Sequence, residues 1–441
     1  MNMSRFLRVR QREGWVVVFH ELHPTPLYVR TEEWWTFIAL LDERHPFFSQ
    51  LKERALLVTS SQEDDAEFAR VEARLLRKLS VPRILYFILA QGCNFACGYC
   101  PVPRLARELG DDRLTVEDMQ SGLKVWSRHL ADEPPAESHV IFYGGEPLLN
   151  KPAFYAALAE IRQMRGAGGL PCDSLKLMLA TNGSLVDDAI IDACLEHDVL
   201  VALGLDGGQE TNDRYRRHAD GNGTFDVIVD ALHRLRARGV RTAVSASITP
   251  ANVDRLDELS GILRELGVEK FGLNFLKGRA LVDLVPLGRR EAFERTSAEA
   301  VLRRHRAQGD EGYEYQVEKK IVAFRTGDFF PMDCTCYGNQ LVVRPNGRIS
   351  NCPFSGGDLG HVRSLGSDFR IAKTEVVAAW RQRLPLRHPE FRDRDAKALC
   401  GPGCAWGARD LTGDELAVDA ALTAFTEEIF DELIWSEFTR G

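Results

Sequence analysis

The stretch Gln91-Gly-Cys93-Asn-Phe-Ala-Cys97-Gly-Tyr-Cys100 comes directly after the apolar run 84–90, Ile-Leu-Tyr-Phe-Ile-Leu-Ala. A strand that ends in three thiols spaced C-x3-C-x2-C is typical of an iron–sulfur cradle, because thiolates are soft ligands and short spacing lets one loop hold several irons. Three thiols leave one iron of a four-iron cubane free for an outside ligand. The alternatives are buried free cysteines or a zinc knuckle, but a knuckle usually needs a fourth Cys or His nearby, and this loop has none.

The composition is that of an ordinary globular chain long enough for two or three domains. The 441 residues are 44% hydrophobic and 27% charged, with a net charge of −8. This balance gives no general basic footprint for nucleic acid, so no nucleic-acid partner is expected. No apolar run reaches the roughly 20 residues of a membrane helix, and the N-terminus lacks an apolar signal core, so we expect no membrane partner and a cytoplasmic location.

The ten cysteines are clustered, which in a reducing compartment favours metal or catalytic roles over disulfides. Besides the opening three, five gather near the C-terminus, namely Cys334, Cys336, Cys352, Cys400 and Cys404. Cys172 and Cys194 stand alone and are interpreted as ordinary core or surface cysteines.

Residues 1–79 are predicted to form a separate small α+β module. A β-hairpin is expected over 6–10 and 15–20, with a third strand at 27–30. Helices are expected at 31–41, with Thr31 as cap, and at 61–79. This shape resembles the winged-helix-like modules with which many peptide-modifying enzymes bind a precursor's leader as an extra strand. A structural cap on the following domain is the alternative.

From about residue 83 the pattern becomes strand, loop and helix, repeated six times. Strands are predicted at 84–90, 140–143, 175–180, 200–205, 242–248 and 270–276, and helices at 116–130, 151–165, 187–197, 225–238 and 252–266. Buried strands alternating with helices favour a parallel sheet, and right-handed crossovers curl six such units into a partial (β/α)6 TIM-like barrel over 83–308. The chemistry of such a barrel lies at the C-terminal ends of its strands. The second, third and fourth strands end in Tyr143-Gly-Gly-Glu-Pro147, Thr181-Asn-Gly183 and Leu205-Asp-Gly-Gly208.

A charged linker is predicted over 309–328, followed by a C-terminal domain over 329–441. Pro345-Asn-Gly347 indicates a turn between two short strands, so Cys336 and Cys352 can face one another. Cys400 and Cys404 add thiols on a glycine-rich loop. A zinc ribbon is the alternative to an iron–sulfur site here. A packing helix is expected over 414–438.

The cysteine loop and the GGEP segment resemble the signatures of the radical S-adenosylmethionine (SAM) family. The resemblance implies a [4Fe–4S] cluster on Cys93, Cys97 and Cys100 that binds SAM at its open iron, and one-electron cleavage of SAM to a 5′-deoxyadenosyl radical. It also implies SAM contacts from Tyr99, Gly144, Gly145, Glu146, Pro147, Asn182 and Asp206, with Arg217 and Ser245 (or Ser247) as further candidates. Arg217 is equally well a surface arginine. Gly204 departs from the family, which often has Ser two residues before the aspartate.

The spacing Cys336–Gly347–Cys352 resembles the opening of the SPASM/twitch extension of that family. A full SPASM has at least seven further cysteines and holds two clusters, so five imply one auxiliary [4Fe–4S] cluster. Cys336, Cys352 and Cys404 are the predicted ligands, with Cys334 or Cys400 as the fourth. Pro353 stands where sulfatase-maturating enzymes commonly have an aspartate, which argues against sulfatase maturation.

The predicted function is a radical SAM–SPASM/twitch peptide maturase that installs an oxidative crosslink, carbon–carbon or thioether, in a ribosomally made precursor. Expected partners are a precursor peptide with a leader and an electron donor such as flavodoxin or ferredoxin. The alternatives are a radical SAM enzyme acting on a small-molecule intermediate, a sulfatase-maturase-like protein oxidase, and a non-enzymatic iron–sulfur or zinc scaffold. No general base is identified from the sequence.

Overall fold

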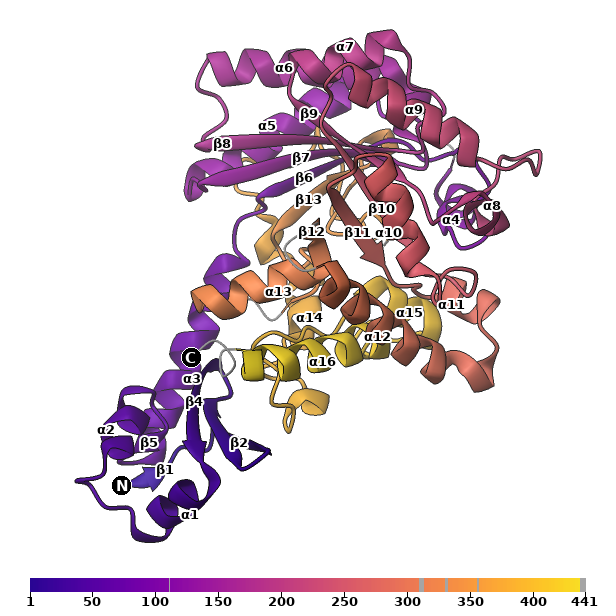
Figure 1. Ribbon diagram of the computed structural model, residues 1–441. Coiled ribbons are helices and arrows are strands. Elements are labelled where there is room, and N and C mark those ends of the chain that lie inside the picture. Colours follow the sequence, from indigo (N-terminus) through magenta and orange to yellow (C-terminus); the bar gives the residue numbers. More distant parts are fainter. Residues whose placement is uncertain (111, 309–312, 330–331, 355–356, 437–441) are drawn as a thin grey trace.

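The computed structural model describes residues 1–110, 112–308, 313–329, 332–354 and 357–436. Figure 1 shows a large body built around a curved sheet, and a small module at one end that joins it through the long helix α3 (Ser61–Lys78). The end of helix α16 (Ala420–Ser436) lies close to that module.

The large body contains the predicted six-unit barrel. Its strands are β6 (Ile84–Ala90), β7 (Glu137–Gly144), β8 (Ser174–Thr181), β9 (Val199–Gly204), β10 (Thr242–Ser247) and β11 (Lys270–Asn274), parallel and in chain order. The helices between them are α4 (Val102–Leu109), α5 (Val116–Asp132), α6 (Lys151–Gly166), α7 (Asp188–Glu196), α8 (Gln209–Tyr215), α9 (Phe225–Ala237) and α10 (Leu256–Glu265). The partial (β/α)6 architecture is therefore confirmed, with α10 beginning four residues later than predicted.

The barrel core lies between the strands and the outer helices. Phe87, Phe142 and Leu179 are fully buried on one face of three adjacent strands. Phe142 packs edge-on against Phe154 of α6, with ring centroids 4.9 Å apart. Because side chains alternate along a strand, the neighbours of these residues point the other way, into the barrel.

The sheet continues beyond the six strands at both edges. Strand β12 (Tyr313–Glu314) pairs with β11, and β13 (Gln340–Val343) pairs in parallel with β6. Strand β14 (Ile349–Ser350) returns antiparallel to β13, so the hairpin predicted around the Pro-Asn-Gly turn is present. The cysteine hairpin of the C-terminal part is thus anchored to the strand that carries the N-terminal cysteine loop.

The segment predicted as a linker, 309–328, contains β12 and helix α13 (Tyr315–Thr326); residues 309–312 lie outside the described residues. Not all of its charged side chains face solvent, because the Lys320 ammonium is buried 3.1 Å from the carboxylate of Asp333. One cation of the predicted charged linker therefore forms a buried ion pair.

Further helices complete the large body. They are α11 (Arg279–Leu284), α12 (Arg290–Gln308), α14 (Glu375–Trp380), α15 (Ala405–Thr412) and α16, with six short 3₁₀ turns at Pro147–Asn150, Leu287–Arg289, Pro345–Gly347, Ile371–Lys373, Arg381–Arg383 and Pro389–Phe391 among the described residues. The helix predicted over 414–438 begins at Ala420; residues 437–438 lie outside the described residues.

The N-terminal module has a three-stranded antiparallel sheet of β2 (Leu7–Arg12), β3 (Trp15–His20) and β4 (His23–Arg30), as predicted. Helices α1 (Thr31–Leu40) and α2 (Pro46–Glu53) follow, and β1 (Asn2–Met3) pairs with β5 (Leu57–Val58). Arg30, and not Thr31, is the cap residue of α1.

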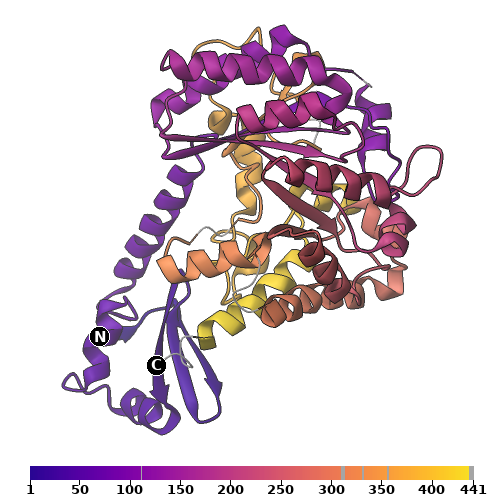
Figure 2. The same cartoon turned by 45° about the horizontal axis from the view of Figure 1, so that its top comes forward.

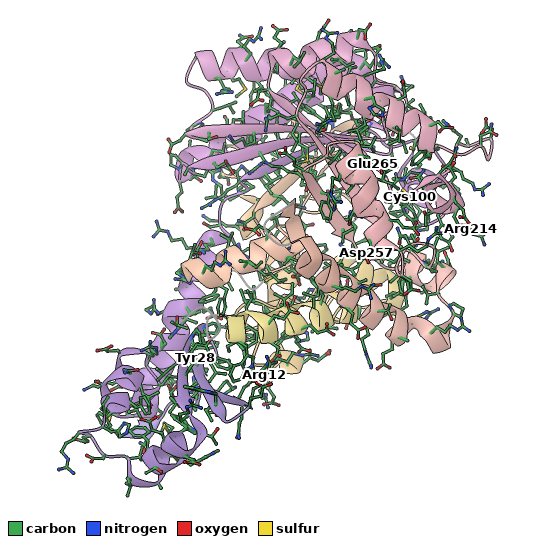
Figure 3. The ribbon with its side chains drawn as sticks, in the orientation of Figure 1. Arg12, Tyr28, Cys100, Arg214, Asp257 and Glu265 are labelled. Carbon is green, nitrogen blue, oxygen red and sulfur yellow. The ribbon has the colours of Figure 1, made fainter. Side chains whose placement is uncertain are left out.

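The sheet of this module packs against the C-terminal helix α16, as Figure 2 shows. Phe19 meets Phe430 edge-on with ring centroids 5.4 Å apart, and the Arg10 guanidinium lies 2.8 Å from the Asp431 carboxylate. The Tyr28 hydroxyl donates to the carbonyl of Ile434. Figure 3 shows Arg12 and Tyr28 in this region and Cys100 far away at the barrel.

Among the described residues, no helix is both long and apolar enough to cross a membrane.

Candidate SAM and iron–sulfur site

The cysteine loop follows β6 and is held by backbone hydrogen bonds to a segment more than 100 residues away. The amides of Ala96 and Gly98 donate to the carbonyls of Arg217 and Tyr215, both at 2.8 Å. The amide of Phe95 points at the Cys93 sulfur, 3.4 Å away. A long-range backbone clamp therefore fixes the loop, and one of its own amides is aimed at a thiol.

Gly144 and Gly145 let the end of β7 pack directly on this loop. A Cβ at Gly144 would lie 2.3 Å from the Ala90 carbonyl oxygen, and one at Gly145 would lie 2.2 Å from that of Gly92. Neither distance is sterically allowed, and the φ of Gly144 is +151°. The amide of Glu146 then donates to the Gly92 carbonyl at 2.9 Å. The two glycines are needed for packing against the cysteine loop.

The Glu146 carboxylate is fully buried and accepts three hydrogen bonds. The donors are the amide of Leu148 (2.9 Å), the hydroxyl of Thr181 (2.8 Å) and the amide of Asn182 (2.7 Å). Burial raises the pKa of Glu146 to about 6, and these donors limit the rise. The carboxylate thus ties the end of β7 to the end of β8, while its contact with a SAM amino group stays a prediction.

A second hydrogen-bond network is centred on Asp206 and includes Tyr99, which lies in sequence between the last two cysteines of the loop. Buried Asp206 accepts from the Tyr99 hydroxyl, from the amide of Ser247 (2.8 Å) and from the Arg216 guanidinium (3.0 and 3.3 Å). That guanidinium lies 5.6 Å from the centre of the Tyr99 ring. Gly204 leaves it room, because a Cβ at Gly204 would lie 2.4 Å from Arg216 Nη1. The space where the family often has a serine is therefore filled by an arginine.

The sequence-predicted residues are distributed unevenly around this site. The Asn182 amide group lies 3.8 Å from the Cys93 sulfur. Ser245 accepts from the Asn274 side chain at 2.8 Å and is in register with Gly204. Arg217 instead bonds to the carbonyl of Gly221 at 3.1 Å near the surface. Arg216, which sequence analysis missed, is the arginine that the structure brings to the site.

The C-terminal thiols separate into a group of four and one outlier. The thiols of Cys334, Cys352 and Cys404 all influence the pKa of Cys336. The Cys336 thiol and the nearby ammonium of Lys277 lower the pKa of Cys334 to about 6. The outlier, Cys400, is buried in the main hydrophobic core beside α16 instead, with its sulfur 3.9 Å from the carbonyl oxygen of Thr423.

This grouping decides which thiols suit an auxiliary cluster. The charged groups with the largest influence on the pKa of Cys400 are Asp333, Lys320, Glu427 and Arg394. Amide donors also point at two of the four grouped thiols, from Phe354 to Cys352 (3.4 Å) and from Gly407 to Cys404 (3.3 Å). Hydrogen bonds to sulfur of this kind tune iron–sulfur potentials.

Both thiol groups fit clusters better than single ions. A cubane is larger than one ion, so its thiolate ligands stand farther apart than the ligands of a zinc knuckle. Burial raises the pKa of Cys93 to about 12 and that of Cys97 to about 11, so these thiols need a metal to become thiolates.

An ion pair joins the two thiol groups. Arg104, four residues after Cys100, donates to the carboxylate of Asp410 at 2.5 Å. Asp410 lies six residues after Cys404, is largely buried, and also accepts the amide of Arg279 at 2.7 Å. The Arg104 guanidinium additionally lies 5.8 Å from the Trp406 ring. The loop of each thiol group is therefore tied to the other.

Residues 87–266 match the model of the radical SAM superfamily, so this chain carries a radical SAM domain. The C-terminal ends of β6, β7, β8 and β9, which carry the residues described above, all lie within this range.

The relatives extend this similarity. The serine-type anaerobic sulfatase-maturating enzyme of Klebsiella pneumoniae is 28% identical over 158 residues, 34% of this chain and 38% of that protein. The AdoMet-dependent heme synthase of Methanosarcina barkeri is 24% identical, over 78% of this chain and 96% of that protein. The chain spans little more than a third of the length of the sulfatase-maturating enzymes that it matches.

Two solved structures share the fold. The structure of anSMEcpe with bound AdoMet and Cp18Cys peptide has a TM-score of 0.65 at 18% identity, covering 81% of this chain and 99% of that one. Streptococcus suis SuiB bound to precursor peptide SuiA has a TM-score of 0.52 at 15% identity, covering 96% and 99%. The second similarity includes the N-terminal module in its span.

Proposed function

We propose that this protein is a radical SAM peptide maturase that installs an oxidative crosslink in a precursor peptide. One observation carries the proposal: a three-thiol loop at the barrel mouth and a four-thiol group in the C-terminal part are held together by the Arg104–Asp410 pair. When bound, SAM and the two clusters supply hydrogen abstraction and a place for the released electron. The chain's own residues hold these groups and orient the substrate.

The ligands follow from the grouping of the thiols. Cys93, Cys97 and Cys100 hold the SAM cluster. The auxiliary cluster is held by Cys334, Cys336, Cys352 and Cys404, and Cys400 is left as a buried core thiol. We assign SAM contacts to Tyr99, the Gly144–Pro147 segment, Asn182, Asp206 and Ser245. We replace Arg217 by Arg216 in this set, because Arg216 is the arginine that is bonded to Asp206.

A peptide substrate is supported by two fold relatives that bind peptides. SuiB is bound to precursor peptide SuiA, and anSMEcpe is bound to the Cp18Cys peptide. The N-terminal module supports a leader, because it carries a three-stranded antiparallel sheet with β2 and β4 as its edge strands. An edge strand of this kind accepts an extended peptide as a further strand. An external electron donor such as flavodoxin or ferredoxin completes the proposal.

Sulfatase-type maturation is the second candidate, favoured by the similarity to the sulfatase-maturating enzymes. Pro353 follows Cys352 and has no proton-accepting side chain, so the oxidation would need another base. The buried ammonium of Lys277 lies near Cys334 and Cys404. Burial lowers its pKa, but these thiols and nearby carboxylates raise it by more, so the ammonium keeps its proton and cannot serve as that base.

The test is anaerobic turnover of the full chain with SAM, a reductant and the candidate precursor. Loss of two hydrogens from the peptide by mass spectrometry is expected, together with 5′-deoxyadenosine. The Cys97→Ala variant is expected to form no 5′-deoxyadenosine while keeping the iron of the auxiliary site. SAM cleavage that persists in this variant contradicts the assigned cluster.

Deletion of residues 1–79 separates peptide from small-molecule substrates. A leader-dependent enzyme loses turnover of its full precursor, while circular dichroism and iron content show that the large body, which packs on this module through α16, is still folded and loaded. Unchanged turnover after the deletion contradicts leader recognition by this module.

A further inference from the structure

Tyr143 is the residue just before the two glycines, and its side chain points into the barrel. Its neighbour Phe142 points outward against α6, and successive side chains of a strand face opposite sides. On the adjacent strand, Tyr86 meets Tyr143 edge-on with ring centroids 6.0 Å apart. Tyr143 therefore stands on the inner wall of the barrel, at the end where the cysteine loop lies.

The Tyr143 ring also connects this wall to the auxiliary thiols. It meets Phe354 edge-on at 6.1 Å, and the amide of Phe354 points at the Cys352 sulfur. Phe354 in turn lies 5.3 Å from Trp406. On its other side, Tyr143 continues into Gly144, which packs on the carbonyl of Ala90 at the base of the cysteine loop. One half-buried tyrosine thus lies between the two groups of thiols.

The Tyr143 hydroxyl is a donor without a partner in the part of the chain that the structure describes. An ordinary tyrosine phenol keeps its proton at neutral pH, so this hydroxyl can donate a hydrogen bond. Tyr143 is half-buried, and its hydroxyl is not among the fully buried polar atoms that lack a partner in the described part of the chain, so it is open to an incoming acceptor. A peptide offers such an acceptor at every residue, as the carbonyl oxygen of its backbone.

We propose that the Tyr143 hydroxyl donates a hydrogen bond to a backbone carbonyl of the substrate peptide and thereby holds it between the two cluster sites. This role rests on the proposed function and specifies where the peptide's reacting segment lies. The rings of Tyr86, Phe354 and Trp406 supply the apolar surface beside it.

The test uses the anaerobically reconstituted full chain with SAM and a pool of capped hexapeptides. Peptides that the protein retains are identified by mass spectrometry, labelled, and titrated by fluorescence anisotropy. Tyr143→Phe keeps the ring and removes one neutral hydrogen bond, so about three- to tenfold weaker binding is expected. Tyr155→Phe removes the same group from the outer helix α6 and is expected to change nothing. Iron content shows that both variants are loaded.

An amide-to-ester scan of the retained peptide makes the test specific for a carbonyl acceptor. An ester carbonyl accepts weakly, so one ester position is expected to weaken binding to the unmodified protein and to have no effect on Tyr143→Phe. Equal affinity of Tyr143→Phe and the unmodified protein overturns the role of Tyr143. So does an ester effect that is the same in both proteins. Retention of no peptide by the unmodified protein overturns the placement of a short peptide segment at Tyr143, whereas SAM cleavage measured in parallel reports on the radical SAM site alone.

Discussion

Gly204→Ala is the substitution whose effect follows most directly from the geometry of the site. The new Cβ would lie 2.4 Å from Arg216 Nη1 and 2.8 Å from both Cζ and Nη2, so the guanidinium must leave its place. Its partner Asp206 is 2% exposed, and Arg216 itself is 11% exposed. The substitution therefore separates a largely buried ion pair without removing either charge.

The magnitude follows from the contacts that remain. Removing one partner of a buried ion pair costs about 3–5 kcal/mol. Here Asp206 keeps its bonds to the Tyr99 hydroxyl and the Ser247 amide, and the arginine side chain can swing toward solvent. About half of that cost, ~2 kcal/mol, is expected, which lowers the Tm of a domain of about 200 residues by about 4–8 °C.

The assay is thermal unfolding of the full chain followed by circular dichroism, as a double-mutant cycle with Arg216→Ala. Midpoint shifts are compared, because a chain with several domains need not unfold in two states. In the Arg216→Ala background, Gly204→Ala meets no guanidinium and is expected to cost nothing. Gly261→Ala in α10 is the control: it meets no atom within 4 Å, and alanine favours the helix by about 1 kcal/mol. The reasoning is refuted if Gly204→Ala lowers the Tm equally with and without Arg216, or not at all.

Three further predictions test the thiol assignment, the link between the two sites and a buried histidine. Cys400→Ala is expected to keep all the iron of the reconstituted protein, whereas Cys334→Ala loses about half of it by iron analysis; equal loss in both contradicts the assignment. Asp410→Ala removes the shared acceptor of two partly exposed donors, so unfolding is expected about 1 kcal/mol easier by thermal denaturation, and a change under about 0.5 kcal/mol speaks against the link. His129 accepts the amide of Ile371 at 3.1 Å through Nε2, and burial lowers its pKa below 6.5. Because the unfolded state then binds the proton more readily, this contribution is full above about pH 6.5 and is lost on acidification. The stability gap between the unmodified protein and His129→Leu is expected to narrow from about pH 7.5 to about pH 5.5 in urea denaturation, and a constant gap rules out this titration.

The sequence by itself determined the barrel, because its signals are local. Six apolar runs alternate with amphipathic stretches. The cysteine loop of residues 93–100 and the glycine pair Gly144-Gly145 lie at the ends of two of these runs, so both can be recognised from the sequence alone. The Pro-Asn-Gly turn likewise fixed the hairpin of β13 and β14. Each of these features depends on residues a few positions apart.

Only the tertiary structure decided which of two residues close together in sequence lies at the site. Arg216 and Arg217 are adjacent in an extended segment, so their side chains point to opposite sides, and only contact with Gly204 and Asp206 shows which one is buried. Spacing could not separate Cys400 from Cys404, since the distance between loops far apart in the chain is set by how they pack. The pairing of β13 with β6, and with it the position of Tyr143 between the two groups of thiols, has the same origin.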